Sequence, residues 1–272
     1  MKRVINIILV LCIVVCIGLL GYSGYQIYLW HNANKNIEKQ VKEIEEKVDV
    51  QPVEDNSKTE IINPPKKDEN KSDPYWDYIK VKLINVDFTK LKEINNETVG
   101  WIQVGGTNVN YPFVQTIDNK YYLTHQLDGT SNTAGWIFMD YRNSIDNFDK
   151  NTILYGHGRL NYTMFGSLRN VVDKSWYENK NNYIVKISTE TENTLWQVFS
   201  TYKIKTTSDY LQIDFNSDDD YMDFLNMLKN RSVHDYKVNL TPNDKIISLS
   251  TCHNDKYKIV LHAKLIKREK KE

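Results

Sequence analysis

The sequence predicts a mostly β domain in which about eight strands form a closed antiparallel or mixed β-barrel, with helices on its N-terminal side and one helix inserted late. Short segments rich in Val, Ile, Tyr, Trp and Thr recur between clusters of Gly, Asn and Asp. They do not alternate with helices as the strands of a parallel sheet do. The expected strands are 99–104, 108–115, 135–139, 152–155, 183–187, 194–204, 245–251 and 257–266.

The helices are predicted from apolar periodicity and from capping residues. Segments 75–85 and 87–94 carry apolar residues at helical spacing and precede the barrel. Ser217 is a good N-cap for the late helix, and the acidic cluster at 218–220 fills its first turn. That cluster is not followed by the Gly and Glu of a calcium-binding EF-hand loop, so we interpret it as helix capping and expect no metal site.

The first 31 residues are typical of a membrane anchor. The stretch Val4–Leu20 is apolar apart from one Asn, and it is followed by aromatic residues up to Trp30. Lys2 and Arg3 precede it, which predicts a cytoplasmic N-terminus and an extracytoplasmic remainder of the chain. A cleaved signal peptide is the alternative, although no A-x-A-like cleavage site is evident.

Three regions follow from this organisation: an anchor over 1–31, a stalk helix with a flexible spacer over 32–74, and a folded domain over 75–272, to which the residues discussed below assign a catalytic role. The stalk helix has one apolar stripe, and the segment 51–74 is rich in Pro, Lys, Asp and Asn. Lys and Arg (35) balance Asp and Glu (35), so nothing in the overall charge favours nucleic acid as a partner.

Cys252 is the leading candidate for a nucleophile. Cys12 and Cys16 lie inside the apolar stretch, so Cys252 is the one thiol of the part expected outside the membrane. It follows the apolar run 246–251, where a rigid strand is expected to end. A buried, unreactive thiol is the structural alternative.

A cysteine nucleophile needs a base, and His157 is the best placed of the six histidines. It follows the expected strand 152–155 and lies between Gly156 and Gly158, which permit close approach and unusual backbone angles.

These residues belong to a larger set of motifs. Leu249-Ser250-Thr251-Cys252 at a strand end, far downstream of Tyr155-Gly156-His157, resembles the sortases. Further stretches resemble class B in particular, over about 75–267: 86–88, 98–102, 111–115, 121–123, 134–143 and 164–168.

The resemblance implies a membrane-anchored cysteine transpeptidase with no metal or organic cofactor. Cys252 would attack a Thr carbonyl in the sorting signal of a secreted protein and form a thioester, and His157 would move the protons. The acceptor would be the amine of a peptidoglycan cross-bridge or of its lipid-linked precursor, lipid II. A pilin-polymerising sortase, a cysteine endopeptidase and a weakened module that only binds wall peptides are the alternatives.

The resemblance also identifies further site residues. The family has an Arg on the strand after the Cys, but this sequence has Lys258 there, which offers a point charge without the planar guanidinium fork. Either Lys258 acts in its place in a weaker form, or an Arg from another loop substitutes, or the enzyme is slow. The structural alternative is that Lys258 is a solvated strand residue. Asn119, Leu123 and Ser250 would line the peptide groove, although each also has an ordinary structural explanation.

Overall fold

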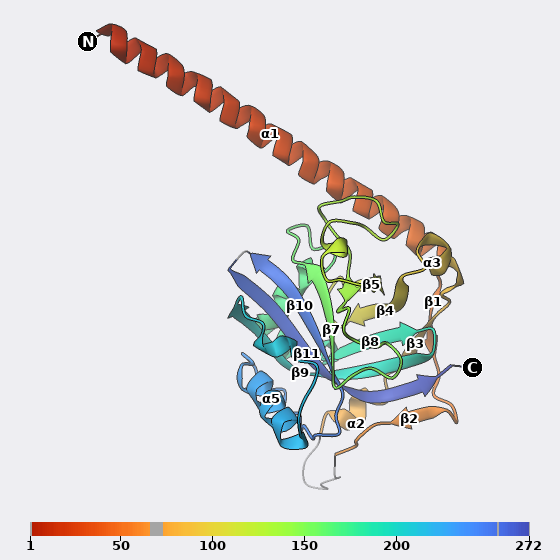
Figure 1. Ribbon diagram of the computed structural model, residues 1–272. Helices are drawn as coiled ribbons and strands as arrows, with labels where there is room; N and C mark the ends of the chain where they lie inside the picture. The colour runs from red at the N-terminus through yellow and green to blue at the C-terminus, as the bar shows by residue number, and fades with distance from the viewer. Residues whose placement is uncertain (1, 66–72, 255, 272) are drawn as a thin grey trace.

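The computed structural model describes residues 2–65, 73–254 and 256–271, with the side chains of 252–254 excepted. In this part of the chain, eight strands form a closed ring in the order β10-β7-β6-β5-β4-β8-β9-β11, and β11 pairs with β10 to close it (Figure 1). Pairs β10–β7 and β5–β6 are parallel and the other pairs are antiparallel. The predicted mixed eight-stranded barrel is therefore confirmed.

The strands of the ring agree with the predicted segments apart from their ends. They are β4 Thr98–Val104, β5 Asn110–Val114, β6 Phe138–Met139, β7 Asn151–His157, β8 Ile184–Thr189, β9 Glu192–Lys205, β10 Ile246–Asn254 and β11 Tyr257–Lys270. Large side chains such as Trp101, Trp136 and Trp196 are fully buried in the core. Burial of this apolar surface is the main stabilising contribution to the barrel.

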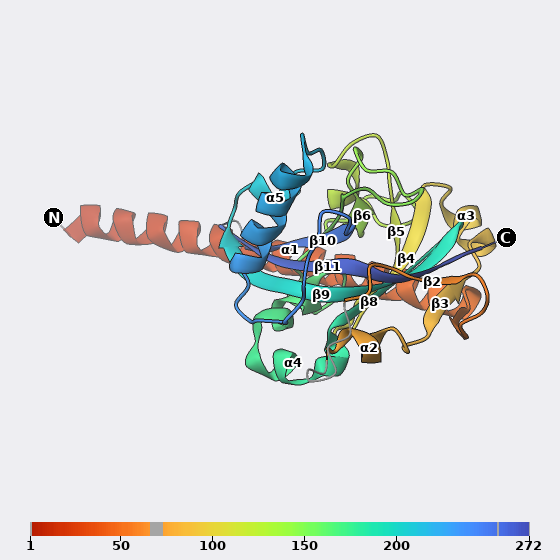
Figure 2. The same cartoon turned by 90° about the horizontal axis from the view of Figure 1, so that it is seen from below.

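Helix α5 Asp218–Asn230 is the predicted late helix. The Ser217 side chain accepts a hydrogen bond from the Asp220 backbone N–H at 3.1 Å, as an N-cap should. The apolar face of the helix is buried, with Tyr221, Phe224, Leu225 and Leu228 on it. A shorter helix, α4 Lys174–Glu178, lies on the other side of the barrel (Figure 2).

The structure differs from the expected helix over 75–85. Helix α2 Tyr75–Tyr78 is a single turn, and β3 Leu83–Val86 is a strand. Strand β3 pairs antiparallel with β1 Val50–Val53, which lies in the expected spacer. This long-range pairing outweighs the local helical pattern. Helix α3 Thr89–Ile94 corresponds to the second predicted helix, with Leu91 buried.

Other parts of the expected stalk and spacer also pack on the barrel. Strand β2 Thr59–Ile61 pairs antiparallel with residues 267–269 near the C-terminal end of β11. The described part of 51–74 therefore contains residues of two strands, while 66–72 lies outside the described residues. Helix α1 Lys2–Lys47 is one continuous helix whose first half is exposed and apolar enough to cross a membrane, and whose second half lies against the domain (Figure 1).

Candidate active site

The register of three neighbouring strands brings the predicted catalytic residues into one row. Strand β10 pairs in parallel with β7, with Cys252 opposite His157, and antiparallel with β11, with Cys252 opposite Lys258. Adjacent strands lie about 4.8 Å apart. The Cys252 backbone is therefore the direct neighbour of both residues, although its side chain lies outside the described part of the structure.

A cavity of about 560 Å³ opens at this end of the barrel. The five other predicted site residues all line it: His157, Lys258, Asn119, Leu123 and Ser250. The other lining residues are Phe138, Tyr155, Gly156, Thr206, Thr207, Ser208, Tyr210, Leu211 and Thr251. The cavity is thus lined by apolar side chains together with a few polar groups, as peptide and ligand sites commonly are.

The His157 ring is held by the backbone of the loop opposite. Its Nε2 lies 2.7 Å from the Leu123 carbonyl oxygen. Because a carbonyl only accepts hydrogen bonds, Nε2 carries the proton, and Nδ1 carries the lone pair of the neutral ring. Leu123, predicted as a substrate contact, thus also orients the base through its main chain.

Gly135 makes room for this ring. Its φ of +61° is in the left-handed region, and a Cβ there would lie 2.8 Å from His157 Cδ2 and 2.5 Å from the Tyr122 carbonyl oxygen. Only glycine tolerates both the angle and the close approach. Gly135 stands in one of the motifs that carry the family resemblance, but nothing in the local sequence indicates its contact with His157.

The surroundings favour the neutral form of His157. Burial lowers the pKa of its imidazole, the hydrogen bond to Leu123 opposes this shift, and the positive charges of Arg159 and Lys258 lower the pKa further. A neutral imidazole at pH 7 can accept a proton from a thiol or an amine. Lys258 therefore lines the cavity and also lowers the pKa of His157.

The substrate-facing walls are tied together by hydroxyl and amide groups. The Ser250 and Tyr210 hydroxyls lie 2.8 Å apart. Asn119 Oδ1 accepts a hydrogen bond from the Tyr141 backbone N–H at 3.0 Å, so its carbonyl oxygen fixes the loop. The amide of Asn119 is therefore held in a set orientation at the edge of the cavity.

An ion pair between Asp140, which is buried, and Arg142, which is exposed, supports the same wall and was not predicted from the sequence. Arg142 Nη2 donates to Asp140 Oδ2 at 2.8 Å and to the Leu211 carbonyl oxygen at 3.0 Å. The Tyr155 hydroxyl donates to Asp140 Oδ2, also at 2.8 Å. Burial of Asp140 opposes its ionisation, but the hydrogen bonds from Arg142 and Tyr155 and the positive charge of Arg142 together outweigh burial and lower the pKa of the carboxyl group. The signal in the sequence was an Asp and an Arg two residues apart in the 134–143 motif.

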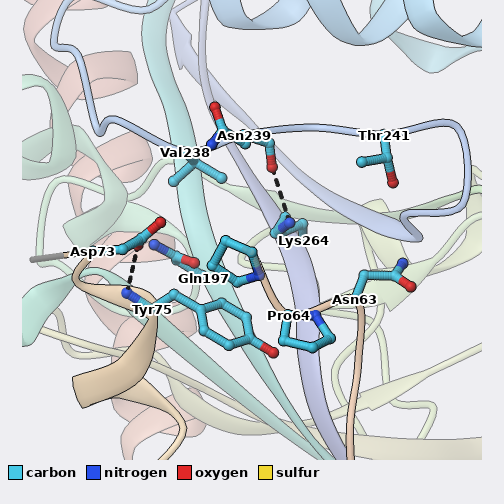
Figure 3. Close-up of a pocket in the computed structure, with 10 residues that line it drawn as sticks. Asn63, Pro64, Asp73, Tyr75, Gln197, Val238, Asn239, Thr241 and Lys264 are labelled. Atoms are coloured by element: carbon cyan, nitrogen blue, oxygen red, sulfur yellow. Dashed lines mark hydrogen bonds between the residues drawn. The ribbon is translucent and has the colours of Figure 1, made fainter. Parts of the chain in front are cut away.

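A second cavity of similar size lacks these chemical groups. It measures about 580 Å³ and lies beside Lys264, six residues further along β11 than Lys258, which is roughly 20 Å for a strand (Figure 3). Lys264 Nζ donates to the Asn239 carbonyl oxygen at 2.9 Å and lies 3.4 Å from the Asp244 carboxylate. The described lining includes neither a histidine nor a cysteine.

Nothing in the described residues indicates a metal centre. Among them, no group of three or more His, Cys, Asp or Glu side chains is placed to hold a metal ion. The cavity carries histidine, lysine and hydroxyl groups, and the Cys252 backbone lies beside them.

Comparisons with known proteins agree on one family. The family model described as the Sortase domain matches residues 102–266. Sortase B of Staphylococcus aureus is 40% identical over 189 residues, which cover 68% of this chain and 76% of the relative. Sortase B of Listeria monocytogenes is 34% identical over 189 residues, which cover 65% and 72%.

Solved structures give the same result. A structure described as the Staphylococcus aureus sortase B–substrate complex is similar at a TM-score of 0.62 and 40% identity, over 66% of this chain and 84% of that one. A crystal structure of Staphylococcus aureus sortase B alone is similar at the same TM-score and identity, over 66% and 86%.

Proposed function

This chain belongs to the sortase family as a class B-like cysteine transpeptidase, and on this premise we propose that Cys252 is its nucleophile and His157 its acid–base residue. The observation that carries the assignment is the register of β7, β10 and β11, which makes the Cys252 backbone the neighbour of His157 on one side and of Lys258 on the other. The cavity beside this row supplies a binding cleft.

The proposed reaction has two acyl transfers. The sulfur of Cys252 attacks the carbonyl carbon of a Thr in the sorting signal of a secreted protein, and the peptide C–N bond breaks as the thioester forms. Neutral His157 takes the thiol proton as the sulfur attacks, and the imidazolium formed in this way donates that proton to the leaving amine. An incoming amine then attacks the thioester, His157 accepts its proton, and the thiolate leaves. The similar structure described as a sortase B–substrate complex supports a substrate-binding role for the corresponding domain of this chain.

Lys258 is proposed to stabilise the negative charge that develops on the Thr carbonyl oxygen. Its side chain lines the cavity, and its charge acts on His157. An ammonium group supplies charge but not the two parallel N–H donors of a guanidinium. We therefore expect Lys258 to perform the role of the family Arg less effectively. Asn119, Leu123 and Ser250 are proposed to contact the sorting peptide from the cavity wall.

The proposed setting is the outer face of the cell membrane. The exposed apolar half of α1 is consistent with a single-pass anchor, and Lys2 and Arg3 favour a cytoplasmic N-terminus. The catalytic domain would then lie outside the membrane, where the amine of a peptidoglycan cross-bridge or of lipid II is the proposed acceptor.

The test uses the full chain in detergent micelles, a library of sorting peptides and a peptidoglycan-like amine. We expect the wild type to form the amide product and a thioester on Cys252 detectable by mass spectrometry. Cys252→Ala should abolish both without changing the circular dichroism spectrum. The control is Cys12→Ala, which removes a thiol in the anchor and should leave turnover unchanged.

Two results would overturn the assignment. Acyl transfer to the amine that persists in Cys252→Ala would exclude Cys252 as the nucleophile. Peptide cleavage at the same rate with and without the amine, with only hydrolysed product, would indicate a cysteine endopeptidase.

A further inference from the structure

The second half of α1 forms hydrogen bonds with both loops that surround His157. The Leu127 backbone N–H donates to Gln40 Oε1 at 2.9 Å, and Asn132 Nδ2 donates to the Ala33 carbonyl oxygen at 3.1 Å. Arg159 donates to Asn34 Oδ1. Figure 1 shows this part of the helix passing along the loops at the same end of the barrel. A helix expected to be a solvated stalk is therefore bound to the catalytic end.

These contacts are buried, not peripheral. The Asn34 and Gln40 side chains are buried, and Ile37 and Ile44 on the same helix face belong to the hydrophobic core. Buried polar groups that lose their partners cost about 1–3 kcal/mol each, so the contacts fix the helix to the loops.

The first of the two loops holds the His157 ring. The Asn132 backbone N–H donates to the Thr124 carbonyl oxygen at 2.8 Å, and the Gly135 backbone N–H donates to the Asn132 carbonyl oxygen at 2.9 Å. These bonds connect Asn132, which contacts α1, with Gly135 beneath the ring and with Leu123, whose carbonyl oxygen binds Nε2. A shift of the helix would therefore shift the acceptor that orients the imidazole.

The second loop carries Arg159, two residues beyond His157. Its main chain is fixed, because Arg169 Nη2 donates to its carbonyl oxygen at 2.6 Å and Gly166 packs directly against that oxygen. Its side chain is half-buried, and Nε has no hydrogen-bond partner within the described structure. The bond to Asn34 is thus the polar contact that places this positive charge near His157.

We propose that residues 33–47 of α1 are a positioning element of the active site, in which Asn34 and Gln40 hold the two loops that orient His157. This inference rests on the proposed function of His157. Asn34 lies four residues beyond Trp30, about 6 Å along a helix, so the same contact would fix the site close to the outer membrane surface. The anchor would then contribute to the rate of acyl transfer as well as to the location of the active site at the membrane.

The test compares variants of the full chain in micelles with one sorting peptide and one amine. In Asn34→Ala combined with Gln40→Ala, we expect kcat to fall about tenfold or more with KM little changed, because a displaced base slows chemistry more than binding. Asn34→Asp and Gln40→Glu keep an acceptor oxygen and should restore kcat. Lys39→Ala, on the exposed face of the same helix, is the matched control.

A second readout separates this proposal from the proposed function. Hydrogen exchange at the His157 ring carbon, followed by mass spectrometry, reports the pKa of His157 without turnover. Arg159 and Lys258 are the charged groups that lower this pKa, so Asn34→Ala should raise it as Arg159 moves away, and Lys39→Ala should not change it. If the wild type shows no acyl transfer, the proposed function fails. The change in the pKa of His157 then still tests whether α1 positions the His157 ring.

The proposal would be overturned by a double variant whose kcat and His157 pKa both match those of the wild type. It would equally fail if kcat fell only in proportion to the fraction of folded protein, measured by circular dichroism, because the contacts would then be merely stabilising.

Discussion

His157 and His262 show how the same side chain is used in two different ways by one barrel. His262 is fully buried on β11, where its Nδ1 lies 2.7 Å from the Ser248 hydroxyl and its Nε2 lies 2.8 Å from the Tyr202 hydroxyl. Ser248 donates its own proton to Asn151 Oδ1 at 2.7 Å, so it accepts from Nδ1–H. Both ring nitrogens of His262 are therefore used by a fixed, neutral network.

His157 has the opposite arrangement. It is half-buried at a cavity, its Nε2–H is donated to a backbone carbonyl oxygen, and the lone pair of the neutral ring is on Nδ1. Burial lowers the pKa of both imidazoles, to about 3 for His262. The lowered pKa therefore does not distinguish a catalytic histidine from a structural one. What distinguishes them is the cavity beside the ring and the row that contains Cys252.

The largest expected effect separates the two histidines by mutation. His157→Gln should lower the rate of transfer by about 100- to 10,000-fold, the usual contribution of acid–base catalysis, and leave the fold intact. His262→Gln should leave the rate per folded molecule unchanged and lower the free energy of unfolding by about 1–3 kcal/mol, because buried hydroxyls lose partners. Transfer kinetics and urea denaturation of both variants measure these effects. The reverse pattern would contradict our interpretation of the pair.

A smaller effect is expected from the backbone that supports the His157 ring. In Gly135→Ala, the new Cβ would push the ring and the Tyr122 carbonyl apart, and we expect transfer to slow by about 10- to 100-fold. Gly129→Ala is the matched control, because its φ is also positive at +79° but its Cβ would meet only the Tyr121 hydroxyl, at 3.4 Å. Equal losses of rate in the two variants would mean that backbone strain, and not contact with His157, is responsible.

The barrel and the key residues could be predicted from the sequence because each has a local signal. Strand composition, the N-cap at Ser217 and the ordered motifs around His157 and Cys252 can all be read without knowing any distant contact. The structure places five of the six predicted site residues around one cavity, and the backbone of the sixth beside it.

The features that could not be predicted all depend on contacts between distant segments. The pairing of 50–53 with 83–86 and the docking of α1 are examples. The apolar stripe that includes Ile37 and Ile44 can be recognised in the sequence. A stripe of this kind does not show which surface of the protein it packs against. Gly135 was in a recognised motif, yet its role depends on a ring more than twenty residues further along the chain.

The smallest effect concerns stability and follows from the pKa of His262. Its pKa is about 3 in the folded protein and about 6.5 in the unfolded chain, so between these values the unfolded state binds a proton that the folded state does not. This contribution to stability is complete above about pH 6.5 and declines as the pH falls, by at most about 1.4 kcal/mol per pH unit. The other titratable groups of the protein are present in His262→Gln as well, so their contributions cancel in the comparison. The difference between wild type and variant, measured by urea denaturation from pH 7.5 to pH 4.5, should therefore shrink towards low pH. If the unfolding free energies of the wild type and His262→Gln fall in parallel as the pH is lowered, His262 does not remain neutral in the folded barrel. The contrast with His157 would then lose its physical basis.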